Sequence, residues 1–473
     1  MSPDAQLAFA SIAEIAALFR KRKLSPVELT RFLLERISTL NPKLNAYLTV
    51  SADLALRQAK QAEAELFGRA GKKRDRGPLH GIPISLKDNI YTAGVRTTAG
   101  SQILRNFIPE QDAKVVSQLR EAGAVLLGKT NLHEFAYGVT SNNPHFGPVR
   151  NPWDTQRIPG GSSGGSAAAL AAGLCYGSIG TDTGGSIRIP AALCGVVGLK
   201  PTLGRVSVAG TIPLSPTLDC VGPLARTAAD VALLAAPIFN RQKEELPLHR
   251  TAKVGRAKKK FRLGVPREFL ASDISPEIAS AFAGATRSLE RAGVRLIDMS
   301  IPLLPETEDA GNQIAWPEAT HYHQQSGWFP AKAAEYSEDV RSRLELGVKV
   351  SATVYLQALE TRELFIRQFH QALEEDHLDA VISPTTPIPA PLIGEETTSI
   401  NGHTRSTRAL LLRFNRPANL AGIPAISVPC ALTPQGLPAA IQFIAAIHAE
   451  STLLQLAATF ETLHPPLPHP PNF

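Results

Sequence analysis

Two glycine- and serine-rich runs of this chain could carry acyl-transfer chemistry. The first run, 160–165, reads Gly-Gly-Ser-Ser-Gly-Gly, and the second, 180–186, reads Gly-Thr-Asp-Thr-Gly-Gly-Ser. Two adjacent glycines before Ser186 allow backbone N–H groups to turn toward one point. Such donors stabilise the negative charge that develops on a carbonyl oxygen when a hydroxyl group attacks it. The second run therefore predicts a serine nucleophile with an oxyanion hole beside it.

A serine nucleophile needs a group that accepts its proton, and neither run contains a histidine. Lys87 is a candidate because it ends the apolar segment 83–87, where burial would disfavour the ammonium form. Lowering a lysine pKa from about 10.4 to about 7.5 requires roughly 4 kcal/mol, which a buried site can supply. A strand-end lysine that reaches water is an equally good interpretation, and Lys129 and Lys200 lie in similar local sequences. Spacing does not choose among the three lysines.

A competing motif makes Ser163 the nucleophile. Residues 161–165 match Gly-x-Ser-x-Gly, the nucleophile elbow of α/β-hydrolases, which requires a preceding strand and a histidine later in the chain. Pro159 argues against a central strand directly before this motif. The elbow is therefore the weaker hypothesis.

A second competing motif runs from Gly123 to Thr130 and matches the phosphate-binding loop of nucleotide-binding proteins. That loop needs a strand before its first glycine and flexible residues within it. Here a helix is expected at 113–121, and Ala-Val-Leu-Leu at 124–127 favours a buried strand. A non-catalytic nucleotide-binding protein is thus only a remote alternative.

Helices and strands that would position these residues can be placed from periodicity and capping signals. One helix is expected at 7–24, and Ser25 with Pro26 and Glu28 predicts the start of a second helix that ends near residue 40. Further helices are expected at 166–172, 276–292, 352–375 and 452–463. Strands are expected at 82–89, 263–265, 380–383 and 425–428. This alternation indicates one mixed α/β domain.

Composition indicates a globular protein with a large core. The chain has 473 residues, of which 44% are hydrophobic and 19% are charged. Its net charge of +7 is small for this length, and the basic runs at 72–74 and 256–262 lie far apart, which favours a solvated surface over a nucleic-acid site. The cysteines follow no disulfide or metal-binding spacing, so reduced thiols are expected at Cys175, Cys194, Cys220 and Cys430.

The beginning of the chain does not read as a secretory signal. Its first apolar stretch, 7–19, contains Glu14 and precedes the basic residues 21–23, the reverse of a signal peptide's charge order. No run of about 18 apolar residues is present. We therefore expect a cytoplasmic protein that makes no membrane contact.

The glycine- and serine-rich runs resemble the amidase signature family. Residues 160–173, 180–191 and 194–202 follow the signature almost without a break, and this long match is specific. Further resemblance lies in the segments 81–88, 128–131, 146–153 and 417–424. The resemblance therefore covers most of the chain.

The resemblance implies both a fold and a set of catalytic roles. The implied fold is α/β, a single α/β/α domain at 1–473 around a large, twisted, mixed β-sheet, with a helical N-terminal segment at 7–66 and a signature core at 78–230. Lys87 would act as the base, Ser162 as a bridging serine preceded by a cis peptide bond, and Ser186 as the nucleophile. The implied oxyanion hole consists of the N–H groups of Thr183, Gly184, Gly185 and Ser186.

Residues around the nucleophile have expected supporting roles. Asp182 and Arg188 flank it and are expected to form an ion pair that fixes the loop, rather than to contact substrate. By the same resemblance, an acyl pocket would be lined by Tyr137, Gly138, Val139 and Thr140, although a role in the apolar core fits these four residues equally well.

The implied function is hydrolysis of a carbon–nitrogen amide bond through an acyl-enzyme on Ser186, with esters, carbamates or anilides as side substrates. The alternative is the glutaminase subunit of a tRNA-dependent amidotransferase, for which we expect an acidic residue shortly before the segment 417–424. This chain instead has Leu-Leu-Arg-Phe-Asn-Arg at 411–416, which would not suit a free α-amino group. A neutral or acidic amide is therefore the expected substrate of a stand-alone enzyme.

No cofactor or metal ion is implied by any of these motifs. The expected partner is the small-molecule amide itself, with no direct nucleic-acid contact, and a homodimer is compatible with the sequence. Because pocket shape and not the catalytic residues selects the acyl group, the sequence does not identify the natural substrate.

Overall fold

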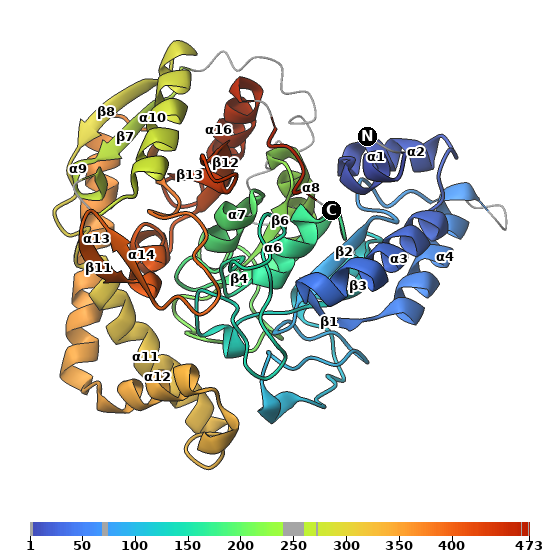
Figure 1. Cartoon of the computed structure of the whole chain (residues 1–473), viewed down its shortest axis with the longest axis horizontal. Helices are drawn as coiled ribbons and strands as arrows, with labels where there is room; N and C mark the ends of the chain where they lie inside the picture. The colour runs from blue at the N-terminus through green and yellow to red at the C-terminus, as the bar shows by residue number, and fades with distance from the viewer. Residues whose placement is uncertain (1–2, 69–73, 240–259, 271–272, 465, 472) are drawn as a thin grey trace.

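One sheet of eleven strands runs through the molecule and collects strands from both halves of the chain (Figure 1). The computed structural model describes residues 3–68, 74–239, 260–270, 273–464, 466–471 and 473. In spatial order the strands are β1 (Tyr47–Val50), β3 (Val125–Thr130), β2 (Pro83–Lys87), β4 (Gly177–Asp182), β6 (Cys220–Ala225), β5 (Val197–Lys200), β12 (Ala425–Leu432), β13 (Pro438–Ile444), β9 (Ala380–Pro384), β7 (Arg262–Pro266) and β8 (Arg295–Met299).

The sheet is mixed, as predicted. Strand β2 pairs in parallel with both β3 and β4, so the ends of these three strands meet at one edge. Antiparallel pairs connect β4 through β6, β5, β12 and β13 to β9, and β7 pairs in parallel with β9 and β8. A separate hairpin consists of β10 (Thr397–Ile400) and β11 (His403–Ser406).

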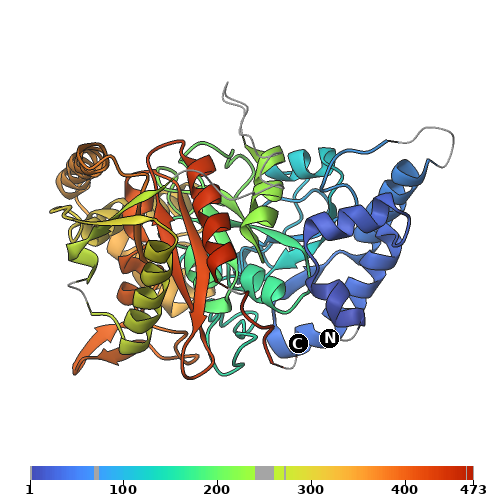
Figure 2. The same cartoon turned by 90° about the horizontal axis from the view of Figure 1, so that it is seen from above.

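Helices cover both faces of the sheet (Figures 1 and 2). On β13 the Phe443 ring packs against Phe460 of α16 with ring centroids 6.3 Å apart, whereas the next residue, Ile444, belongs to the core around α13. This alternation follows from the two-residue period of a strand. The helices are α1 (Pro3–Phe9), α2 (Ile12–Arg20), α3 (Pro26–Leu44), α4 (Ala52–Phe67), α5 (Lys114–Glu121), α6 (Gly164–Ala171), α7 (Arg188–Cys194), α8 (Ala228–Ile238), α9 (Arg267–Leu270), α10 (Pro276–Arg291), α11 (Thr307–Gln325), α12 (Glu338–Lys349), α13 (Ala352–Glu375), α14 (Thr407–Arg413), α15 (Arg416–Leu420) and α16 (Glu450–Leu463).

The N-terminal region differs from the prediction in one respect. Instead of one helix at 7–24, two helices form, because the Ser11 hydroxyl accepts a hydrogen bond from the Glu14 N–H and starts α2 with a capping box. The predicted start of the next helix is confirmed, since Ser25 and Glu28 form a capping box with Pro26 in the first turn. That helix continues to Leu44, past the expected end near residue 40, with Pro42 inside its last turn.

The segment that matches the phosphate-loop pattern folds as part of the sheet. Gly123 precedes β3, and Gly128, Lys129 and Thr130 all belong to this strand. Strand β3 pairs with β1 on one side and β2 on the other, so its backbone groups take part in sheet pairing. The expected buried strand is confirmed, and it extends three residues beyond the predicted end at residue 127.

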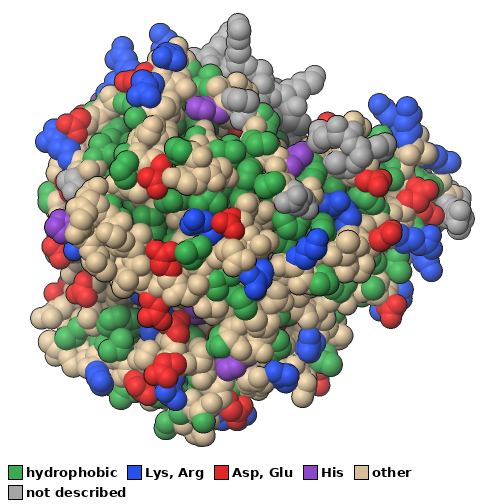
Figure 3. Space-filling model, in the orientation of Figure 1, with side chains coloured by type: hydrophobic (Ala, Val, Ile, Leu, Met, Phe, Trp, Pro, Cys, Tyr) green, Lys and Arg blue, Asp and Glu red, His purple; other side chains and the backbone are tan. Residues whose placement is uncertain are grey.

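On the face drawn in Figure 3, Lys and Arg side chains are interspersed with Asp and Glu. All four cysteines are buried and free of disulfide bonds. Among the described residues, no helix is both long and apolar enough to cross a bilayer, and no cluster of three or more His, Cys, Asp or Glu side chains could hold a metal ion.

Candidate active site

Lys87 lies at the end of β2, where its neighbours β3 and β4 run parallel to it. Its side chain is fully buried. The Nζ atom is 2.7 Å from Ser162 Oγ and 2.7 Å from Thr181 Oγ1, and it also lies 3.4 Å from the Thr181 carbonyl oxygen. The lysine head is thus held between two hydroxyl groups, one from each of two neighbouring segments.

Burial changes the protonation of Lys87. Removal from water lowers the pKa of the ammonium group to about 7, even though the charges of Asp182 and Asp219 act in the opposite direction. A substantial fraction of Lys87 is therefore neutral near pH 7, and a neutral amine can accept a proton.

The two rival lysines have other environments. Lys129 Nζ donates to the Ile90 carbonyl oxygen and to Thr97 Oγ1, and it lies 3.8 Å from Asp88 Oδ1. Lys200 Nζ donates to the Pro201 carbonyl oxygen at 2.8 Å. Of the three lysines, Lys87 alone is hydrogen-bonded to a serine of the run 160–165.

Ser162 and Ser163 lie in the loop that leads into α6. The peptide bond between Gly161 and Ser162 is cis. Ser163 differs from Ser162 because its hydroxyl donates to the Thr181 carbonyl oxygen at 3.3 Å. The Ser163 N–H donates to the Ser186 carbonyl oxygen at 3.1 Å, so the two glycine- and serine-rich runs lie side by side.

Ser186 lies between β4 and α7, and the residue is 6% exposed. Gly185 precedes it with φ of 120°, a conformation that favours glycine, and a Cβ atom there would approach Asn415 Cβ to 2.6 Å. The Gly185 N–H donates to Asp182 Oδ1 at 2.8 Å. This corrects the expectation that Gly185 offers its N–H to an oxyanion, because Asp182 already accepts that hydrogen. Thr183, Gly184 and Ser186 remain as the candidate donors.

Asp182 and Arg188 form the expected ion pair, with Arg188 Nη2 3.1 Å from Asp182 Oδ1 and both side chains fully buried. Burial would raise the pKa of Asp182, but the adjacent Arg188 guanidinium holds that pKa below its usual range. Arg188 also donates to Asn419 Oδ1 at 2.6 Å and to Gln442 Oε1 at 3.2 Å. The turn before Ser186 is therefore fixed to α15 and β13.

A small cavity opens at Ser186. Three of the four expected pocket residues, Tyr137, Gly138 and Val139, line it together with Thr183, Gly184, Leu214, Ala315, Arg408, Leu412 and Arg416. The fourth, Thr140, does not line this inner cavity but lines a larger outer one of about 1390 Å³. The two cavities share Val139 and Arg408, so the outer one forms the approach to the inner one.

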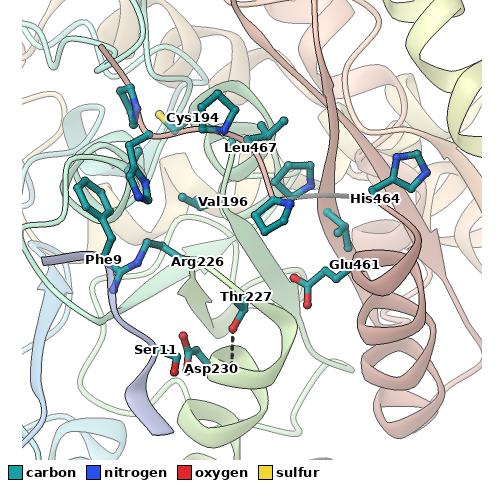
Figure 4. Close-up of a pocket in the computed structure, with 18 of the residues that line it drawn as sticks. Phe9, Ser11, Cys194, Val196, Arg226, Thr227, Asp230, Glu461, His464 and Leu467 are labelled. Atoms are coloured by element: carbon teal, nitrogen blue, oxygen red, sulfur yellow. Dashed lines mark hydrogen bonds between the residues drawn. The ribbon is translucent and has the colours of Figure 1, made fainter. Parts of the chain in front are cut away.

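Another large cavity lies between the two ends of the chain and holds none of the candidate catalytic residues (Figure 4). Its walls include Phe9, Arg226, Asp230 and Glu461, and the Phe9 ring stacks on His469 with centroids 3.7 Å apart. Its volume of about 1410 Å³ exceeds that of the inner cavity. Because the outer cavity that leads to Ser186 has a similar volume of about 1390 Å³, size alone does not distinguish the two regions.

Sequence reasoning missed three residues of the site. Thr181 holds the lysine head, and Arg408 and Arg416 line the inner cavity. Of these three residues only Arg416 lies in the run 411–416, whose basic character by itself argues only against an amino-group site.

The fold defines the class of protein. A solved structure described as an amidase superposes with a TM-score of 0.87 at 34% identity, covering 96% of this chain and all of that one. The native peptide amidase from Stenotrophomonas maltophilia superposes with a TM-score of 0.81 at 30% identity, covering 99% of each chain. The predicted α/β fold with a large mixed sheet is thereby confirmed.

The chain belongs to the amidase family, whose model matches residues 28–454. A curated relative, a glutamyl-tRNA(Gln) amidotransferase subunit from Moorella thermoacetica, is 37% identical over 96% of this chain and 97% of its own length. The predicted family is therefore confirmed, and the chain is an amidase-family hydrolase.

Proposed function

We propose that the chain hydrolyses linear amides through an acyl-enzyme on Ser186, with Ser162 and Lys87 relaying the proton. The observation that carries this proposal is the buried hydrogen bond of 2.7 Å between Lys87 Nζ and Ser162 Oγ, beside the run that contains Ser186. A buried neutral amine next to two hydroxyl groups is a proton acceptor for a serine nucleophile.

In this mechanism Ser186 Oγ attacks the carbonyl carbon while its proton passes to Ser162 and the Ser162 proton passes to Lys87. The N–H groups of Thr183, Gly184 and Ser186 stabilise the oxyanion. Lys87 then returns a proton through Ser162 to the leaving nitrogen, the carbon–nitrogen bond breaks, and the acyl-enzyme remains. A water molecule attacks this ester, gives its proton to the same relay, and releases the carboxylic acid and free Ser186.

The lining of the inner cavity supports a proposal for the substrate class. Its lining combines apolar side chains such as Val139 and Leu412 with the guanidinium groups of Arg408 and Arg416. We propose a neutral or acidic small-molecule amide, with esters, carbamates or anilides as side substrates. A stand-alone cytoplasmic enzyme without a cofactor fits this proposal.

The alternative is a glutaminase subunit in a tRNA-dependent amidotransferase, and the name of the Moorella thermoacetica relative supports it. Against it stand Leu412 and Arg416, which line the cavity in the segment where an acidic partner for an α-amino group was expected. Glutaminase activity that appears only when partner subunits are added would favour the alternative over a stand-alone amidase.

The direct test is reaction of the purified protein with a fluorophosphonate, followed by mapping of the adduct by peptide mass spectrometry. We expect one adduct, on Ser186, because that hydroxyl is both activated and accessible. An adduct on Ser163 would instead support the nucleophile-elbow hypothesis. Absence of any adduct from a folded sample would contradict an activated serine in the isolated chain.

The pH dependence of turnover should follow Lys87. Because burial lowers the pKa of this lysine to about 7, the neutral form that accepts a proton is lost as the pH falls below that value. We expect kcat/KM to decrease about tenfold per pH unit below the pKa of Lys87 and to level off above it. A profile of kcat/KM from pH 5 to pH 9 tests this, and a flat profile down to pH 5 would contradict it.

The two adjacent serines should differ strongly in their effect. Ser162→Ala removes the hydroxyl that accepts from Lys87 Nζ, and we expect a loss in kcat of about 10³-fold. Ser163→Ala removes only a bond to the Thr181 carbonyl oxygen and should cost less than about tenfold. Steady-state kinetics on both variants provide the comparison, and equal losses would show that the relay is not assigned to the correct serine.

A further inference from the structure

Three buried hydrogen-bond donors around the inner cavity have no acceptor. Within the described part of the chain, no hydrogen-bond partner is found for Tyr137 Oη, Arg408 Nε or Arg416 Nε, and all three residues line the cavity at Ser186. Buried polar groups are nearly always paired, so an unpaired group calls for an explanation. Three unpaired donors around one cavity indicate a site that awaits an acceptor.

Arg416 stands next to the nucleophile loop. The residue is only 3% exposed, and a Cβ atom on Gly184 would come within 2.9 Å of Arg416 Nη1. Among the described residues, its hydrogen-bonded side chain is Asn312, whose neutral Oδ1 accepts from Nη2 at 2.9 Å. A buried guanidinium that is held by a neutral amide keeps its full positive charge near the reacting centre.

The carboxylates nearest to this pair of arginines do not neutralise it. Glu308 acts on Arg416 electrostatically, and Asp339 acts on Arg408, but among the described residues neither forms an ion pair within 4.0 Å with these arginines. Asp339 is instead bound to Arg343 and to His133. Asp182, the third neighbouring carboxylate, is paired with Arg188.

The pKa shifts of Tyr137, Arg408 and Arg416 agree with a positively charged site that has no anion to pair with. Burial, followed by the charges of Arg343 and Arg416, lowers the pKa of Arg408 to about 9. Burial also lowers the pKa of Arg416 and raises that of the Tyr137 hydroxyl, which therefore remains a neutral donor near pH 7. An anion placed between these groups would offset the unfavourable free energy of holding two cations in a cavity.

We propose that Tyr137, Arg408 and Arg416 bind a carboxylate of the substrate, so that the enzyme acts on small amides that carry a free carboxylate near the scissile carbonyl group. Planar guanidinium groups donate two parallel hydrogen bonds to a carboxylate, and the Tyr137 hydroxyl donates a further hydrogen bond from another direction. The inner cavity is small, which favours a substrate with a short chain. This inference rests on the proposed reaction at Ser186, which it refines to a substrate class.

The test measures how well an acidic amide shields Ser186 from the fluorophosphonate, compared with a neutral amide that has the same number of carbon atoms. The pairs are succinamate with butyramide, and glutaramate with pentanamide. We expect at least one acidic amide to protect Ser186 at a concentration at least tenfold lower than the concentration its neutral counterpart requires. The reason is that hydrogen bonds between charged groups are stronger than those between neutral groups. The proposal is overturned if neither acidic amide protects better than its counterpart.

Variants of Arg416 and Arg408 test whether these two residues cause the preference for acidic amides. Arg416→Gln should remove the advantage of the acidic amide, so that the acidic and the neutral amide protect Ser186 at similar concentrations. Arg408→Gln, at a half-buried position, should reduce the same advantage and serves if Arg416→Gln does not fold. Arg405→Gln is the matched control, because Arg405 is exposed, pairs with Asp273 on the surface and does not line the cavity. An unchanged preference in both cavity variants would contradict the assignment.

The readout separates the two proposals. Failure of the proposed function would appear as absence of labelling on Ser186 before any amide is added. Failure of the carboxylate assignment would appear as normal labelling with no difference between acidic and neutral amides.

Discussion

Replacing Ser186 by alanine should lower kcat for any amide substrate by about 10⁴- to 10⁶-fold, the range seen when a nucleophile is removed from a relay that acts as a unit. The variant loses the serine hydroxyl that lines the inner cavity beside Gly184. Folding should be unaffected, because the contacts that hold the turn are made by the Ser186 carbonyl oxygen and by Asp182 rather than by the Ser186 hydroxyl.

The measurement combines three readings on one sample: ammonia release, fluorophosphonate labelling and the thermal melting temperature. Turnover and labelling should both disappear while the melting temperature stays within a few degrees of the parent protein. If Ser186→Ala retained labelling, the adduct would have to lie on another residue, and the assignment of the nucleophile would be wrong.

Replacing Lys87 by methionine should have nearly the same kinetic effect. Methionine has a similar volume but cannot accept a proton, so the relay from Ser186 through Ser162 has no end point. Burial disfavours the charged form of Lys87 and lowers its pKa to about 7. An apolar side chain at this position avoids the unfavourable free energy of burying a charge. We therefore expect loss of activity without a lower melting temperature.

The matched control is Lys200→Met, which removes another fully buried lysine in the same sheet. Lys200 Nζ contacts the Pro201 carbonyl oxygen and Cys220 Sγ, and neither serine of the relay. This control should retain most of the activity. If Lys87→Met retained as much activity as an active Lys200→Met, the base would have to lie elsewhere in the chain.

Several elements could be predicted because their signals are local. The capping box at Ser25 fixed the start of α3, and the apolar spacing from Ala352 to Glu375 gave both ends of α13 correctly. Strand β4 was missed because its residues, Gly-Ser-Ile-Gly-Thr-Asp, are buried on both faces and show no alternation of apolar and polar side chains. Helix α7 was missed for a similar reason, since Pro190 lies inside a glycine-rich segment that resembles a loop.

Some residues of the candidate site could likewise be predicted from local sequence signals, and others could not. The glycine pattern before Ser186 indicated a nucleophile from the sequence alone, but the choice of Lys87 over Lys129 and Lys200 depends on which lysine meets Ser162 in three dimensions. Arg408 and Arg416 come from helices that are more than two hundred residues away from Ser186 in the chain. No local signal links them to the nucleophile, because their proximity arises from the packing of α14 and α15 beside the end of β4.

The network around Arg188 has a consequence for synthesis of the protein. The residues of the proposed relay all lie within 87–186, yet the turn that carries Ser186 is tied through Arg188 to Asn419 and to Gln442, on elements near the end of the chain. A growing chain on the ribosome therefore contains every reacting group long before it contains the supports for them. The enzyme should remain inert through most of its translation and become competent only when β13 has emerged and paired with β12 and β9.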